Sequence, residues 1–315
     1  MLLLLLALFQ LPVVAPESRE AAALRQPVRT MAVTIDDLPT VSVLGNDLAR
    51  AERTTRDLLA AIRRADVPAT GFVNEGKLYR DGTVDPRRVA LLQQWLDAGL
   101  GLGNHTFSHL DLHQTELKAF EQDVLEGERV TRRLLEATGE KPRYFRHPFL
   151  RTGRSLEVRD GLVSFLEAHG YEVAPVTIDN SDYIFAAAYD RAAAAKEAGT
   201  TARIAAAYLD YMESVVAYYE QQSTVILGRE PAQTLLLHAN ALNAATLEAL
   251  IGRLRKRGYR FVALSAALKD PTYATKDEYV GPGGITWLHR WALTQGMRGA
   301  VFAGEPEVPA WIRGR

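Results

Sequence analysis

The chain has 315 residues, of which 47% are hydrophobic and 24% charged, and its formal net charge is -1. This composition is that of an ordinary globular protein and lacks the basic surface that nucleic-acid binding requires, so no nucleic-acid partner is expected. The chain contains no cysteine, which excludes a disulfide framework and a thiolate metal site. Any metal ion must therefore be held by imidazole and carboxylate groups.

The chain begins with the apolar run MLLLLLALFQLPVVA, which is shorter than the roughly 20 residues that a membrane-spanning helix needs. A polar segment rich in small residues follows, so we interpret residues 1–25 as a signal peptide and leader outside the fold. No Lys or Arg precedes the run and no clear cleavage site follows it, so an uncleaved membrane anchor or a misassigned start codon stays open. The prediction is an exported protein, periplasmic or extracellular, without stable membrane insertion after signal removal.

From Arg29 onward, short β-branched runs alternate with longer helical patterns, which is typical of βαβ units around a parallel sheet. The sequence predicts an α/β fold with strands at residues 31–35, 69–73, 100–104, 144–149, 171–178, 232–238 and within 259–268. The predicted helices cover residues 47–65, 86–98, 115–138, 155–169 and 244–257, the second with Asp85 as its cap and Pro86 at its first position. About seven parallel strands are therefore expected.

The expected barrel covers residues 26–268, because one α/β barrel of about 200 to 250 residues commonly forms a single domain. Residues 185–222 are rich in Ala and Tyr and longer than a strand crossover requires, so we interpret them as a helical insertion of one or two long helices. Residues 269–315 carry GPGGITWLHRW and several prolines but no periodicity sufficient for a separate core. We expect them to form a C-terminal extension packed on the barrel.

Polar side chains interrupt the apolar runs where the predicted strands end. These residues are Asp36 and Asp37 after the first strand, His105 after the third, Arg146 at the fourth, Asp179 and Asp182 after the fifth, and His238 after the sixth. In a barrel of parallel strands, the carboxyl ends form the one face on which active sites are built. The sequence therefore predicts that these groups meet.

The adjacent carboxylates of TIDD, Asp36 and Asp37, point in different directions at a strand end, so one can bind a metal while the other accepts a proton. The alternative is a turn or helix cap, for which Asp is also favoured. In NHTFSHLDLH, a helical segment would place His105 and His109 on one face at a spacing suited to one metal ion. His113 extends the series, and we interpret it as a surface or outer-shell histidine, with a third ligand as the alternative.

TIDD, HTFSH, RHPF, DNSDY and LLLH, in this order and spacing, resemble the motif set of the polysaccharide deacetylase family, the NodB-homology domain of family 4 carbohydrate esterases. The resemblance extends over roughly residues 29–265 and implies a distorted (β/α) barrel. It implies a metal site made of Asp37, His105 and His109, with coordination positions left for water and substrate. The ligand type favours Zn2+, and Co2+ or another divalent ion remains possible.

The resemblance also implies the catalytic roles: Asp36 as general base, Arg146 as its brace, and His238 as general acid. Leu236 matches the leucine that lines the acetyl methyl pocket, although a leucine in an apolar strand is also simply core. Phe149 stands where the family usually has Tyr, and its backbone N–H is expected to bind the oxyanion. These assignments depend on the motif matches.

Several positions depart from the family pattern and indicate a divergent branch. Leu38 and Pro39 follow TIDD in place of the commoner TFDDG form, and Tyr183 replaces the Trp of the D-x-x-D-W element. One of Asp179 and Asp182 is expected to orient either the histidine or the arginine, without a decision between them. His147 has no assigned role.

The predicted function is metal-dependent hydrolysis of N-acetyl groups on a carbohydrate polymer or oligosaccharide. Two alternatives stay open: an O-acetyl esterase or other amidohydrolase on the same fold, and a non-catalytic carbohydrate-binding relative. The glycan, the native metal and the oligomeric state are not readable from these residues.

Overall fold

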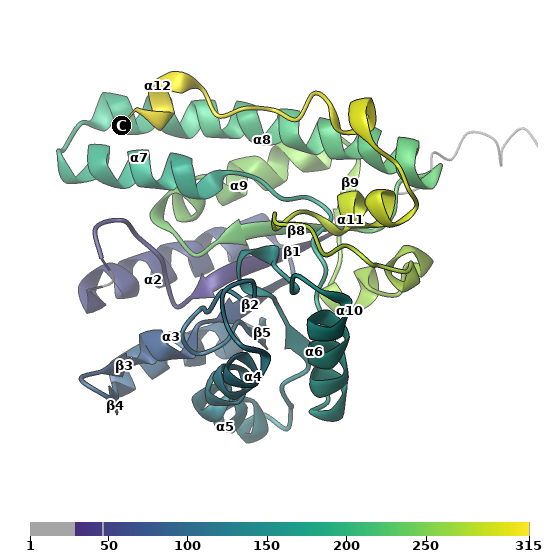
Figure 1. Cartoon of the computed structure of the whole chain (residues 1–315). Helices are drawn as coiled ribbons and strands as arrows, with labels where there is room; N and C mark the ends of the chain where they lie inside the picture. Colours follow the sequence, from purple (N-terminus) through teal and green to yellow (C-terminus); the bar gives the residue numbers. More distant parts are fainter. Residues whose placement is uncertain (1–28, 46, 315) are drawn as a thin grey trace, which may run out of the picture.

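The structure is a computed structural model that describes residues 29–45 and 47–314, so the predicted signal peptide at residues 1–25 lies outside the described residues. Seven strands form one sheet in the order β7-β6-β5-β2-β1-β8, with β9 also paired to β1 (Figure 1). All pairings in this sheet are parallel, which confirms the predicted seven-stranded α/β architecture. The strands are β1 Arg29–Leu38, β2 Ala69–Val73, β5 Gly101–Asn104, β6 Tyr144–Phe145, β7 Glu172–Val173, β8 Gln233–His238 and β9 Tyr259–Phe261.

The sheet is curved into a distorted barrel, and the residues that follow β7 contribute to this curvature. The predicted strand 171–178 is regular only in β7, because Pro175 has no N–H to donate to a strand ladder. Further along, Ile178 makes an isolated parallel bridge to Leu235 of β8. Residues 172–178 therefore link the β6 side of the sheet to β8 and bring the two edges towards each other.

Four predicted helices form close to their expected bounds: α2 Leu48–Ala65, α3 Pro86–Asp97, α6 Leu156–Ala168 and α9 Ala241–Lys256. Asp47 and Asp85 cap the first two by accepting hydrogen bonds from the backbone N–H groups of Arg50 and Arg87. These caps satisfy N–H groups that have no partner within the helix. Local sequence signals were therefore sufficient for these helices.

The single helix predicted over residues 115–138 is wrong: the segment forms α4 Leu117–Glu126 and α5 Arg129–Ala137. A Cβ at Gly127 would lie 2.5 Å from the carbonyl carbon of Thr106, so the break packs directly against the histidine-bearing loop. The buried carboxylate of Glu75 accepts hydrogen bonds from the N–H groups of Val130 and Thr131, at 2.6 and 2.9 Å. Glu75 thus caps α5 from a distant segment, which no local pattern indicates. Glu75 is also the first residue of the short helix η1 Glu75–Leu78. The hairpin that follows, formed by β3 Tyr79–Arg80 and β4 Thr83–Val84, was not predicted.

The predicted helical insertion forms two antiparallel helices, α7 Asp182–Ala194 and α8 Ala198–Leu227, which exceed the predicted range 185–222 at both ends. Both pack against α9, and α8 runs along one side of the molecule (Figure 1). No helix within residues 29–45 and 47–314 is both long and apolar enough to span a membrane.

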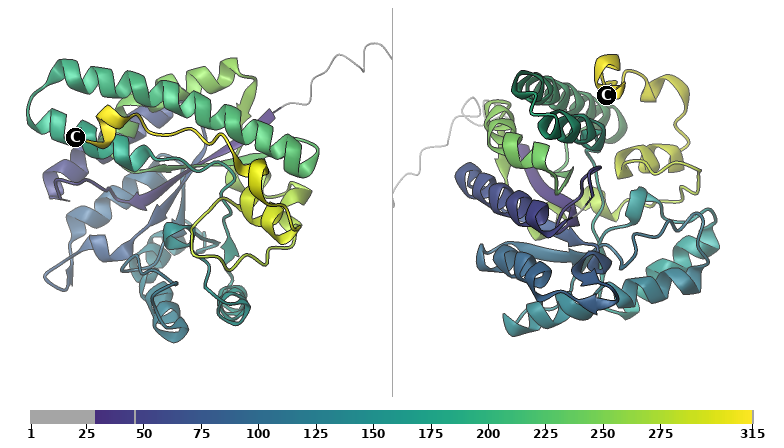
Figure 2. Two further views of the ribbon diagram at one scale, coloured as in Figure 1. Left: turned by 45° about the horizontal axis from the view of Figure 1, so that its top comes forward. Right: turned by 90° about the vertical axis from the view of Figure 1, so that its left-hand side faces the viewer.

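After β9 the chain forms α10 Leu264–Ala267. The C-terminal extension, residues 269–315, then contains η3 Pro271–Ala274, α11 Trp287–Thr294, η4 Gly299–Phe302 and α12 Ala310–Arg313. Helix α11 contacts α8, and α12 contacts α7. The yellow end of the chain therefore returns along the helical insertion, as Figure 2 shows in its left view.

Candidate active site

Two neighbouring strands of the sheet, β1 and β8, carry Asp36 and His238 to the same level. Asp36 of β1 is the register partner of His238 of β8, the last residue of that strand. The β1–β2 register shifts between Ile35 and Leu38, and Asp37 has a φ of 73° in the left-handed region. Such an irregularity re-aims side chains at a strand end. The two carboxylates of TIDD thereby face different partners.

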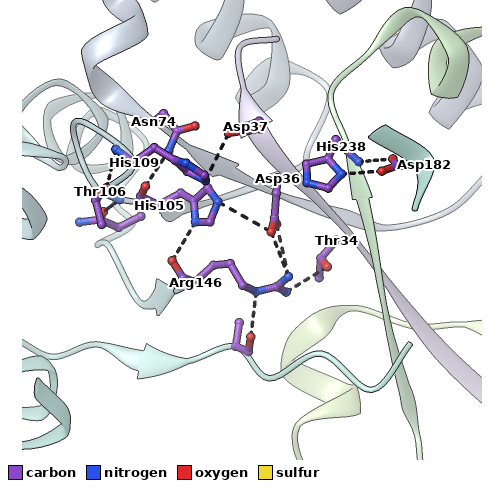
Figure 3. A network of polar contacts seen from close by, with 12 residues as sticks. Thr34, Asp36, Asp37, Asn74, His105, Thr106, His109, Arg146, Asp182 and His238 are labelled. Atoms are coloured by element: carbon purple, nitrogen blue, oxygen red, sulfur yellow. Dashed lines mark hydrogen bonds and ion pairs between the residues drawn. The ribbon is translucent and has the colours of Figure 1, made fainter. Parts of the chain in front are cut away.

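Arg146 holds Asp36 from beneath (Figure 3). Its Nη1 lies 3.3 and 3.2 Å from the two carboxylate oxygens, while Nη2 donates to Thr34 Oγ1 and Nε to the Ala174 carbonyl. Both Arg146 and Asp36 are buried. Burial raises the pKa of Asp36 and outweighs the opposing effect of Arg146. The carboxylate is therefore fixed in orientation and a better proton acceptor than an exposed aspartate.

Asp37, His105 and His109 form a group whose potential ligand atoms all lie within 4.8 Å of one another. The ring centroids of the two histidines are 4.9 Å apart. The His105 Nδ1 lies 2.8 Å from the Arg146 carbonyl oxygen. Because that oxygen can only accept, Nδ1 carries the proton and Nε2 keeps its lone pair for a ligand.

The helical segment expected for these histidines is wrong, since residues 105–116 contain no helix. Thr106 and His109 instead have positive φ values of 65° and 56°. Three hydrogen bonds hold this loop: Asn104 Oδ1 accepts from Thr106 N–H, Thr106 Oγ1 from His109 N–H, and the His105 carbonyl from Asn74 Nδ2. The His105 and His109 rings therefore lie together because these hydrogen bonds hold the loop, and not because of helical spacing. Asn74, Asn104 and Thr106 were missed from the sequence, where only their closeness to strand ends marks them.

The charges of this group suit cation binding. Burial is the main cause that lowers the pKa values of His105 and His109 to about 4, so both imidazoles are neutral at neutral pH. Burial alone would raise the pKa of Asp37, but Lys77 and the nearby histidines hold it below its usual range. Lys77 Nζ lies 3.0 Å from the Asp37 carbonyl oxygen and 3.1 Å from Oδ1. Neutral imidazole and ionised carboxylate are the protonation states that metal ligands require, so these residues fit a divalent cation.

Asp182 is the aspartate that contacts the histidine, a question the sequence left open. Its Oδ1 lies 2.7 Å from His238 Nδ1, and its Oδ2 accepts from the His238 backbone N–H at 2.9 Å and from Asn243 Nδ2 at 2.6 Å. Burial opposes the charged imidazole, yet the contacts with Asp182 outweigh it and raise the pKa of His238 to about 10. His238 is therefore a cation at neutral pH. Asn243 was not singled out from the sequence.

Asp179 occupies a different environment from Asp182. Its Oδ1 accepts from the N–H of Asn180 at 2.7 Å, and burial raises its pKa to about 6. Its charge affects Arg146 and His238, but within the part of the chain that the structure describes it makes no direct hydrogen bond to either side chain. Asp179 is therefore a neighbour of Arg146 and His238 and not a direct partner of either.

A cavity of about 470 Å3 joins these groups. Its lining includes most of the predicted site residues, namely Asp36, Asp37, His105, His109, Phe149, Asp179, Tyr183, Leu236 and His238, together with His147 and Gly284. Arg146 and Asp182 lie behind this wall, fully buried. Phe149 and Tyr183 are 51% and 59% exposed, beside His109 and His238 respectively. The cavity thus has two exposed aromatic rings at its margin.

The two remaining histidines of the motif region differ in position. His113 is not part of the cavity lining or of the ligand group. His147 is buried at 3% exposure, and its Nδ1 has no hydrogen-bond partner among the described residues. Its ring packs against Phe145 and Trp287.

The Asp182→Asn variant is expected to move the alkaline limit of activity towards neutral pH. Because Asp182 does more than Asp37 and Asp36 to raise the pKa of His238, its neutralisation should lower that pKa towards the ordinary value of about 6.5. An imidazole with that pKa is protonated in only about one molecule in thirty at pH 8. A pH profile of kcat on an N-acetylated substrate measures the shift. Asp57→Asn, at an exposed aspartate of α2 outside the cavity lining, is the control. An unchanged alkaline limit in Asp182→Asn would contradict the role of Asp182.

Comparison with known proteins agrees with the motifs. A family model described as polysaccharide deacetylase matches residues 23–174, which include the first three motifs, TIDD, HTFSH and RHPF. Among curated proteins, none matches the sequence.

Solved structures are similar to this chain at low sequence identity. The polysaccharide deacetylase Bc1974 from Bacillus cereus is 19% identical, with a TM-score of 0.51 over 75% of this chain and 91% of that one. The family 4 carbohydrate esterase from Streptomyces lividans in complex with acetate is 17% identical, with a TM-score of 0.47 over 76% and 95%. BA3943 from Bacillus anthracis, a CE4 family pseudoenzyme, is 16% identical, with a TM-score of 0.48 over 76% and 66%. The resemblance inferred from the motifs and the distorted barrel are both confirmed.

Proposed function

Because this chain is related to the polysaccharide deacetylases, we propose that it is a metal-dependent hydrolase that removes N-acetyl groups from a carbohydrate polymer or oligosaccharide. One observation carries the proposal. A buried carboxylate, Asp36, and a cationic imidazole, His238, are register partners in the same cavity as the Asp37–His105–His109 group. Amide hydrolysis needs both a base for water and an acid for the amine.

Asp37, His105 and His109 would hold the cation, and the two-imidazole, one-carboxylate donor set favours Zn2+. When bound, a divalent cation supplies Lewis-acid polarisation of the acetyl carbonyl and a lower pKa for water. The protein prepares this site through the neutral state of both imidazoles and through the Arg146 carbonyl, which sets the His105 tautomer.

Asp36 accepts a proton from the attacking water as the oxygen bonds to the acetyl carbon. Arg146 keeps the Asp36 carboxylate in place by contacts to both of its oxygens. The backbone N–H of Phe149 donates to the oxyanion that forms, a contribution of about 3 kcal/mol for one well-placed donor. Leu236 lines the cavity as an apolar contact for the acetyl methyl group.

His238 then donates a proton to the departing nitrogen as the carbon–nitrogen bond breaks, so the products are acetate and a free amine. An amine leaves poorly without such a proton. Asp182 keeps His238 charged, and its bond to Nδ1 leaves Nε2 as the donor atom. The exposed rings of Phe149 and Tyr183 give the sugar two apolar surfaces at the margin of the cavity.

Acetate release from a panel of acetylated glycans tests the proposal. Chitooligosaccharides, peptidoglycan and acetylated xylan are incubated with the protein, with and without a chelator, and Zn2+ is then added back. We expect release from an N-acetylated glycan, its loss on chelation and its recovery with Zn2+. Release from acetylated xylan alone would instead identify an O-acetyl esterase, and metal binding without release from any glycan would identify a carbohydrate-binding relative.

We further propose that the protein acts outside the cytoplasm, in the periplasm or the medium, a proposal supported by the apolar run in residues 1–25. Residues 26–268 are proposed as the catalytic barrel and residues 269–315 as its C-terminal extension.

A further inference from the structure

The C-terminal extension reaches the candidate active site at Gly284. This residue lines the same cavity as the candidate acid, base and metal ligands. A Cβ at Gly284 would lie 1.7 Å from the carbonyl oxygen of Phe149 and 3.3 Å from the carbonyl carbon of Leu150. Only glycine permits so close an approach of two backbones. In the left view of Figure 2, the loop that precedes α11 bends over the sheet towards the middle of the molecule.

The loop that Gly284 contacts has an unfavourable backbone conformation. Phe149 and Leu150 are consecutive residues with positive φ values of 57° and 53°. Side-chain-bearing residues seldom adopt this left-handed region, and they keep it only where surrounding contacts enforce it. Residues 148–150 form a single short turn, η2, which by itself cannot enforce this geometry. The support must come from the segments packed against it.

The extension supplies this support at further points beside Gly284. Arg290 of α11 is 1% exposed, and its Nη2 donates to Thr152 Oγ1, two residues after the strained pair. Its Nε donates to Asp277 Oδ2 at 2.8 Å, which fixes the guanidinium from within the extension. The Trp287 N–H donates to the Val176 carbonyl at 2.8 Å and anchors the start of α11 on the barrel.

We infer that Gly284 is a positioning residue for catalysis: the extension presses on the Phe149 backbone and sets where its N–H points. The inference rests on the proposed function, in which that N–H donates to the oxyanion. A side chain at position 284 must push away the Phe149 carbonyl, and the adjoining N–H moves with the same residue. A displacement of about 1 Å at a reacting centre can reduce the rate about 100-fold.

The neighbouring Gly283 provides a matched control. A Cβ at Gly283 would meet Ile285 Cγ2 at 3.5 Å and Tyr279 Oη at 3.6 Å, which are ordinary van der Waals distances. Gly283→Ala and Gly284→Ala therefore make the same chemical change in the same tetrapeptide. Only Gly284→Ala is expected to displace Phe149.

The test compares kcat, KM, metal content and thermal unfolding of the wild type and both variants on one N-acetylated oligosaccharide. We expect Gly284→Ala to lose about 100-fold in kcat, with little change in KM or bound Zn2+, while Gly283→Ala resembles the wild type. Equal kcat values for the two variants would overturn the inference. So would a Gly284→Ala defect confined to KM, because that would indicate a substrate contact and not an oxyanion effect.

A second variant covers the case in which Gly284→Ala does not fold. Thr152→Val removes the hydroxyl that accepts from Arg290 and keeps the side-chain shape. A several-fold lower kcat at unchanged KM and metal content would support the inference, and a wild-type kcat would refute it. If the wild type hydrolyses the substrate and the variants do so at the same rate, only the positioning role of Gly284 is refuted. If the wild type hydrolyses none of the acetylated glycans, the proposed function and the inference are refuted together.

Discussion

The His238→Ala variant is expected to lose detectable hydrolysis of N-acetyl substrates while its metal content stays equal to that of the wild type. His238 faces the cavity as a cation, with its pKa raised to about 10, and is the group placed to protonate the departing amine. Loss of a general acid typically reduces the rate by about 100- to 10,000-fold. Acetate release and metal analysis of the purified variant measure the two effects.

His238→Ala also distinguishes amide from ester chemistry. An alkoxide leaves more easily than an amine, so an activated acetate ester should be hydrolysed by the variant at a larger fraction of the wild-type rate. His169→Ala, an exposed histidine at the end of α6, is the control for loss of an imidazole elsewhere. Loss of metal from His238→Ala would contradict the separation of acid and ligand roles.

The His109→Ala variant is expected to lose both metal and activity. His109 is one of three ligand candidates, and its side chain is 27% exposed, so its removal should leave the fold intact. Mutation of a partner outside the ligand set typically lowers metal affinity about 10- to 100-fold. Loss of a ligand itself should lower the affinity by more than about 100-fold. Calorimetric titration of the metal-free protein with Zn2+ measures this loss.

His113→Ala is the matched control for His109→Ala. His113 continues the four-residue spacing but lies outside the ligand group and the cavity lining. The structure therefore predicts wild-type Zn2+ affinity for His113→Ala. Equal losses in the two variants would place His113 among the ligands, and an unchanged affinity in His109→Ala would refute the proposed metal site.

Much of the fold follows from patterns that act over short stretches of chain. Asp85 caps its helix as predicted, and Asp47, the predicted first residue of another helix, caps α2, because a side-chain cap involves residues only a few positions apart. Strands β2 and β8 also form close to their predicted bounds, because their apolar runs are buried in the sheet. Predictions fail where a distant group intervenes. The helix over residues 115–138 divides because Glu75 caps α5 and Gly127 packs on Thr106.

The candidate site also has residues that the sequence identified and contacts that only the structure revealed. Asp36, Asp37, His105 and His238 were identifiable because polar residues at the carboxyl ends of parallel strands share one face. The sequence did not show that Asp182, and not Asp179, contacts His238, or that Lys77 contacts Asp37. Those pairings depend on the register and curvature of the sheet.

By itself, the sequence determined the order of the seven sheet strands and of four helices, the absence of thiolate ligands, and the set of ionisable residues able to meet at one face of the barrel. Only the tertiary structure decided how His109 turns towards Asp37, which aspartate charges His238, and that Gly284 touches Phe149. The physical reason is the distance along the chain over which each interaction acts. Helix caps and hydrophobic periodicity involve neighbours along the chain, whereas left-handed loop residues and buried charge pairs are stable only when distant segments supply their partners.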